Sequence, residues 1–107
     1  MSRKLVLEVG KTYFSVFYAD EKLLHPVLET LIYLGPEIGE DEKAASLHLF
    51  QYAESFHSDG NWKVMTSQER QIFGEPPVIT YEAAHIDPIV DADGLIEELA
   101  QWKARSS

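Results

Sequence analysis

The sequence predicts an α+β fold: a small antiparallel sheet of four to five strands, with a short central helix and a C-terminal helix packed on one face. Three observations predict it. Short runs rich in aromatic and β-branched residues alternate with turn residues over the first half of the chain. A helix-capping pattern begins at Thr66, and an amphipathic stripe lies near the end of the chain. A length of 107 residues predicts one globular domain, residues 1–107.

The first two strands are predicted to form a hairpin around Gly10-Lys11. The run Leu5–Val9 has a strand-like alternation, and Thr12–Tyr18 is rich in aromatic and β-branched residues, which favour strands. Glycine at the first central position suits a tight type II′ turn. We therefore expect Gly10 to have a positive φ and residues 5–9 to pair antiparallel with residues 12–18.

A third strand is expected at Val27–Leu34, which ends at Gly35-Pro36. The next segment, residues 45–56, has two interpretations. Its apolar residues recur at helical spacing, yet Ser46–Tyr52 also has the pattern of a strand that would pair with Val27–Leu34. The sequence leaves strand and helix both open here.

A short central helix is predicted from Ser67 to Phe73. Thr66 and Glu69 have the spacing of a capping box, and Gly74 suits the left-handed position that often follows a helix.

The chain is expected to end with a strand and a helix. Val78–Glu82 has strand character, and Asp91 or Asp93 can cap the helix that follows. The apolar stripe of that helix consists of Leu95, Leu99 and Trp102, widened by Ile96. We expect Trp102 to be buried against the sheet.

The charge of the chain excludes some classes of partner. It has 18 acidic and 9 basic residues, a formal net charge of -9, and no Lys or Arg from Gln71 to Trp102. A field of that sign repels phosphates and favours basic partners, so we expect no nucleic acid. No run approaches the ~20 apolar residues of a membrane span, and the run at residues 5–9 is too short for a signal peptide. We therefore expect no membrane association, and a cytoplasmic domain of a size common in bacterial proteins.

Candidate chemistry is sparse. With no cysteine there is no disulfide, thiol nucleophile or thiolate site, and the four histidines lack the helical spacing of zinc ligands, so we expect neither metal nor cofactor. Clustered carboxylates and interface-prone tyrosines are instead typical of a protein-binding surface. The residues predicted to bind a protein are Glu37, Glu40, Asp41, Glu42, Tyr52, Tyr81 and Glu82.

These features favour a small acidic binding module, not an enzyme, that acts on another protein. Such a module would be an inhibitor, an immunity factor or a regulator of a basic, nucleic-acid-handling partner. The alternative is a small-molecule-binding or enzymatic domain with a pocket between sheet and helix. In that case His48, His57 and His85 would supply acid–base groups. A third alternative is a homo-oligomer that pairs exposed strand edges.

Overall fold

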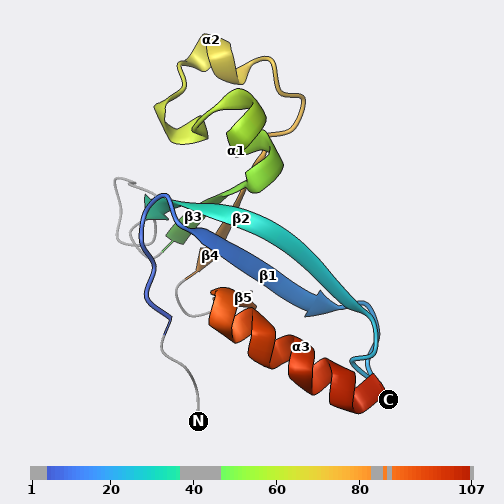
Figure 1. The fold of residues 1–107 in the computed structure, drawn as a ribbon. Coiled ribbons are helices and arrows are strands. Elements are labelled where there is room, and N and C mark those ends of the chain that lie inside the picture. Colours follow the sequence, from blue (N-terminus) through green and yellow to red (C-terminus); the bar gives the residue numbers. More distant parts are fainter. Residues whose placement is uncertain (1–4, 37–46, 83–85, 87, 107) are drawn as a thin grey trace.

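The computed structural model describes residues 5–36, 47–82, 86 and 88–106. In these residues five strands form one antiparallel sheet in the order β4-β3-β2-β1-β5 (Figure 1). The strands are β1 (Thr12–Tyr18), β2 (Pro26–Pro36), β3 (Leu47–Tyr52), β4 (Val78–Glu82) and β5 (Ile89–Val90). The helices are α1 (Ala53–Asp59), the 3-10 helix η2 (Trp62–Val64), α2 (Ser67–Arg70) and α3 (Ala92–Ser106). The predicted α+β class is confirmed.

The predicted hairpin between residues 5–9 and β1 is wrong. Gly10 does have a positive φ, of 86°, but β1 pairs with β2 on one side and with β5 on the other. Strand β2 pairs with β1 along the whole length of β1, and β5 pairs with Phe14 and Ser15 on the other edge, whereas residues 5–9 form no ladder with β1. This segment crosses the core instead. The Tyr13 hydroxyl donates to the carbonyl of Val6 (3.0 Å) and accepts from the amide of Glu8 (2.8 Å).

The ambiguous segment contains both a strand and a helix. Leu47–Tyr52 is β3, which pairs antiparallel with β2 as the strand interpretation predicts. Helix α1 begins at the next residue, Ala53, which explains why helical spacing extends to Phe56. Strand β2 runs on to Pro36, two residues beyond the predicted end, through an irregular register between Tyr33 and Gly35.

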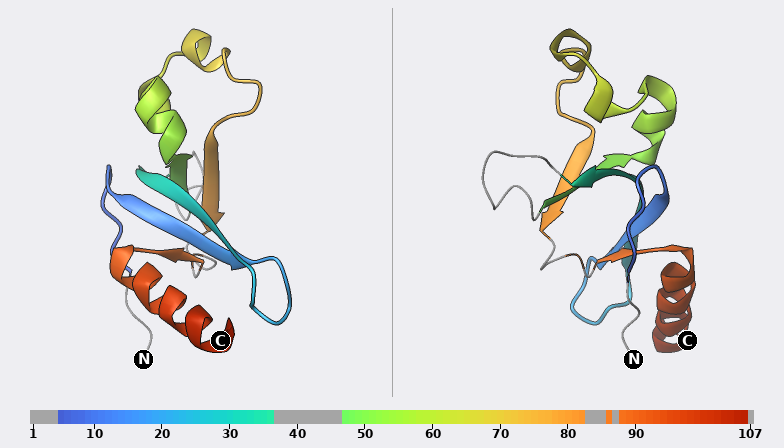
Figure 2. Two further views of the ribbon diagram at one scale, coloured as in Figure 1. Left: turned by 45° about the vertical axis from the view of Figure 1, so that its right-hand side comes forward. Right: turned by 90° about the vertical axis from the view of Figure 1, so that its left-hand side faces the viewer.

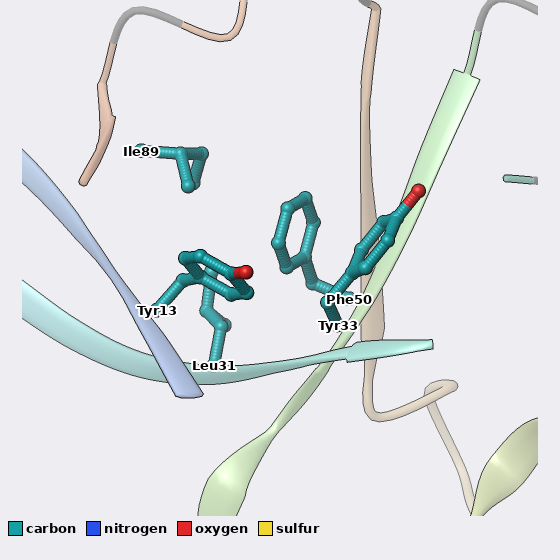
Figure 3. Packing of buried hydrophobic residues seen from close by; sticks show 5 residues of the cluster. All are labelled: Tyr13, Leu31, Tyr33, Phe50 and Ile89. Atoms are coloured by element: carbon teal, nitrogen blue, oxygen red, sulfur yellow. The ribbon is translucent and has the colours of Figure 1, made fainter. Parts of the chain in front are cut away.

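The core lies on one face of a curled sheet. It consists of Tyr13, Leu31, Tyr33, Phe50 and Ile89, all buried (Figure 3). Strands β1 and β4 are separated by two other strands, yet Ser15 Oγ lies 3.2 Å from the hydroxyl oxygen of Tyr81. That contact requires the sheet to bend around the core, since neighbouring strands are ~4.8 Å apart. The side chains of Leu5 and Leu7 pack against the same cluster.

Helix α3 lies alongside β1 and β5 (Figure 1). It begins at a cap formed by Asp91, whose Oδ1 accepts a hydrogen bond of 2.8 Å from the amide of Gly94. Trp102 is half-buried, and its indole Nε1 donates to the carbonyl of Leu24, 2.9 Å away, in the β1–β2 connection. Helix α3 therefore contacts the β1–β2 connection, through Trp102, as well as the sheet. Among the described residues, no helix combines the length and the apolar character needed to cross a bilayer.

Residues 53–77 leave the sheet between β3 and β4, and we call them the lobe. Figure 2 shows the lobe at the end of the sheet opposite α3. The predicted capping box is present: Thr66 Oγ1 accepts from the amide of Glu69 (3.2 Å), and Glu69 Oε1 accepts from the amide of Thr66 (3.0 Å).

The end of the central helix differs from the prediction. Helix α2 ends at Arg70, not at Phe73, and Gly74 lacks the positive φ expected of it. The Arg70 side chain bonds back to the carbonyl of Trp62, and Phe73 packs on the Trp62 ring, so the chain turns at this point. It is Gly60, after α1, whose positive φ of 92° ends a helix of the lobe.

Candidate functional site: an acidic groove in the lobe

A buried glutamine fixes the base of the lobe. Gln51, with no exposed surface, lies near the end of β3. Its Nε2 donates to the carbonyl of Gly60 (2.9 Å) and to Ser55 Oγ (3.1 Å), and its Oε1 accepts from the amide of Trp62 (2.9 Å). Both donor hydrogens and the acceptor oxygen are used, as a buried amide requires. The side chain therefore ties both α1 and the turn after it to the sheet.

An aromatic stack holds the far side of the lobe. The rings of Trp62 and Phe73 meet edge to face, with centroids 5.6 Å apart. The guanidinium of Arg70 lies 4.7 Å from the centroid of the Trp62 ring, and its Nη2 donates to the Trp62 carbonyl at 3.0 Å. Because Gln51 fixes Trp62, the position of Phe73 is set by the same buried contact.

Between these two supports lies a groove of about 410 Å³, which we call the lobe groove. It is lined by Tyr52, Glu54, Ser55, Ser58, Asp59, Phe73 and Pro77. The amide of Tyr52 donates to the carbonyl of Pro77 at 3.0 Å, which brings the two ends of the lobe together. The four residues from α1 are neighbours on that helix, because positions three and four apart lie on one side.

The lobe groove is acidic. Glu54 and Asp59 line it, whereas its described lining includes no Lys or Arg. Burial raises the pKa of Tyr52, as do Glu29, Tyr81 and Glu75, which lie outside the lining of the groove. The lining of the groove thus combines two carboxylates with two aromatic residues, Tyr52 and Phe73.

The predicted protein-binding residues do not gather at one place. Tyr52 lines the lobe groove. Tyr81 belongs to the core side of β4, where its ring meets Phe50 edge to face at 5.9 Å. Glu82 is exposed at the end of β4. The remaining four, Glu37, Glu40, Asp41 and Glu42, lie outside the described residues.

The histidines of the alternative pocket lie in different parts of the fold. His48 is on β3, and its Nδ1 lies 2.8 Å from the hydroxyl of Tyr33. The imidazole tautomer decides which of the two atoms donates. Burial, followed by the nearby Tyr13, raises the pKa of Tyr33. His57 is exposed on α1, and His85 lies outside the described residues. In the part of the chain that the structure describes, no three acidic or histidine side chains gather to hold a metal ion.

Most of the groove residues were not predicted from the sequence. Of its lining, the sequence predicts a role for Tyr52 and none for Glu54, Asp59, Phe73 or Pro77. The spacing of Glu54 and Asp59 would have been informative only with a helix placed over 53–59. Phe73 joins them through contacts with Trp62 that no local pattern reports.

Comparisons of the chain with protein-family models, with curated proteins and with solved structures found no match. The geometry and charge of the lobe groove therefore carry the functional assignment.

Proposed function

We propose that the protein is a small, acidic, non-enzymatic module that binds a basic partner protein as an inhibitor, immunity factor or regulator. The observation that carries the proposal is the lobe groove. It combines carboxylates with aromatic surface on a part of the molecule that stands away from the sheet. Aromatic anchors in a pocket supply much of the energy of protein interfaces, and opposite charge supplies the rate of encounter.

The arrangement of titratable groups favours binding over chemistry. The described lining of the groove has two serines and two carboxylates but no histidine to act as a base. Of the described histidines, His48 is engaged with Tyr33 in the sheet. A binding role needs no such base, and it uses the acidity that the groove does have.

The net charge of -9 would act over a longer range than the groove itself. A negative field accelerates the approach of a positively charged protein, and added salt weakens it because exposed charges are screened beyond ~10 Å at 0.1 M. Association with the true partner should therefore slow as salt is added.

The test is a comparison of association rates. Partners are captured from the native host with the wild-type protein, purified, and measured by stopped flow at several salt concentrations. Glu54→Lys should lower the on-rate more than it raises the off-rate, as charges at the rim of an interface do. The matched control is Glu21→Lys, an equal change of charge at an exposed site in the β1–β2 connection. A second arm reverses Glu40, Asp41 and Glu42 to Lys.

A rate that is independent of salt and of all these substitutions would refute the proposal. The acidity would then serve solubility alone. The alternative of a small-molecule-binding domain would take its place, and His48 and His57 would be the next residues to replace.

A further inference from the structure

Resting on the proposed function, we infer that the lobe groove receives an arginine side chain of the partner. Its lining includes two carboxylates, on Glu54 and Asp59, and two aromatic residues, Tyr52 and Phe73. A guanidinium group satisfies both, because it pairs with carboxylates through fixed N–H donors and stacks on aromatic rings.

The chain already holds one of its own arginines with the same set of groups. Arg105 Nη2 donates to the hydroxyl of Tyr18 at 2.7 Å, and its guanidinium lies 5.2 Å from the centroid of the Tyr18 ring. The carboxylate of Glu98 lies 3.9 Å from the same nitrogen. A tyrosine and a carboxylate thus form an arginine site between α3 and β1. The lining of the lobe groove likewise includes a tyrosine, Tyr52, and two carboxylates, Glu54 and Asp59, and its described residues supply no arginine.

The lobe groove favours arginine over lysine for two reasons. A flat guanidinium retains cation–π contact while donating several hydrogen bonds, whereas an ammonium is a compact, strongly hydrated charge. The walls of the groove are also held in place before binding, since Gln51 and Trp62 fix α1 and Phe73. A rigid aromatic site loses little freedom when it binds a planar group.

The experiment needs no identified partner. The 15N-labelled protein is titrated with the peptide acetyl-Gly-Arg-Gly-amide, and amide shifts are recorded by NMR. Two matched peptides carry citrulline, which has nearly the shape of arginine without its charge, or lysine. The expected result is saturable shifts at residues 52–59 and at Phe73 with the arginine peptide, weaker ones with lysine, and none with citrulline. Glu54→Gln and Asp59→Asn should each weaken arginine binding about two- to fivefold, and Glu21→Gln should not.

Equal shifts with arginine and citrulline, shifts confined to other residues, or no shift at roughly 50 mM peptide would overturn the inference. Both neutral variants replace side chains at exposed positions, so their spectra should keep the wild-type dispersion. The two proposals fail separately. If a captured partner still associates in a salt-dependent way with the Glu54→Gln and Asp59→Asn variants, that result would support the proposed function. It would contradict only the inference that the groove binds an arginine.

Discussion

Replacing Gln51 with leucine should loosen the lobe while the sheet remains folded. Leucine has a similar size and no polar atoms, so the substitution removes three hydrogen bonds with little change in volume. It leaves the carbonyl of Gly60 and the amide of Trp62 without their buried partner. A buried group left without its partner costs ~1–3 kcal/mol. Gly60 is exposed and Trp62 is half-buried, so water replaces part of what is lost and the two together predict a loss of ~1–3 kcal/mol. That loss is measurable against the ~5–15 kcal/mol that stabilises a typical domain.

Two measurements check this prediction. Urea unfolding gives the free energy of unfolding, and hydrogen exchange reports the Trp62 amide, which donates directly to Gln51. We expect a lower midpoint and a larger loss of protection in the lobe than in β1 and β2. Gln71→Leu is the matched control, because Gln71 is an exposed glutamine of the same lobe and exposed substitutions stay within ~0.5 kcal/mol. A Gln51→Leu variant with wild-type stability and an equally protected Trp62 amide would refute the reasoning.

Two further predictions concern the helix α3 and the tyrosines. Trp102→Ala should lower the free energy of unfolding by about 2–4 kcal/mol, below the ~3–5 kcal/mol of a completely buried tryptophan, because Trp102 is half-buried. An unchanged urea midpoint would instead make Trp102 an interface candidate. The free energy of unfolding should also fall as pH rises above ~10. Folding raises the pKa of Tyr18, Tyr33 and Tyr52, mainly through burial. The unfolded chain therefore loses those protons at a lower pH than the folded protein does. Tyr52→Phe should make that fall shallower, and urea midpoints that stay constant from pH ~9 to pH ~11 would contradict the prediction.

Strand composition was enough to place some elements and not their partners. The bounds of β1 and β4 agree with the prediction, because both are short runs of aromatic and β-branched residues. The neighbours of β1 could not be predicted locally. Its second partner, β5, has only two residues, Ile89–Val90, too few to show any alternation. The alternation of residues 5–9 predicts a ladder, whereas in the structure Leu5 and Leu7 pack against the core.

The candidate site depended even more on long-range contacts. Tyr52 could be chosen from its residue type alone, since tyrosine is common at interfaces. The lobe groove exists because the segment around Phe73 returns to α1 through Trp62. The buried side-chain amide of Gln51 holds Trp62 in this position. The sequence does not show which groups the side chain of a glutamine in a strand will bond to.

The two ends of the lobe meet, and this separates the lobe groove from the core of the sheet. Gln51 and Val78 are register partners on β3 and β4, and the next contact along the chain joins the Tyr52 amide to the Pro77 carbonyl. The intervening residues thus leave and re-enter the sheet at adjacent positions, as the turn of a hairpin does. The core residues of the sheet all lie outside this excursion. Sequence change can therefore accumulate in the excursion, altering the residues that line the lobe groove, while the ladder that closes beneath it stays the same.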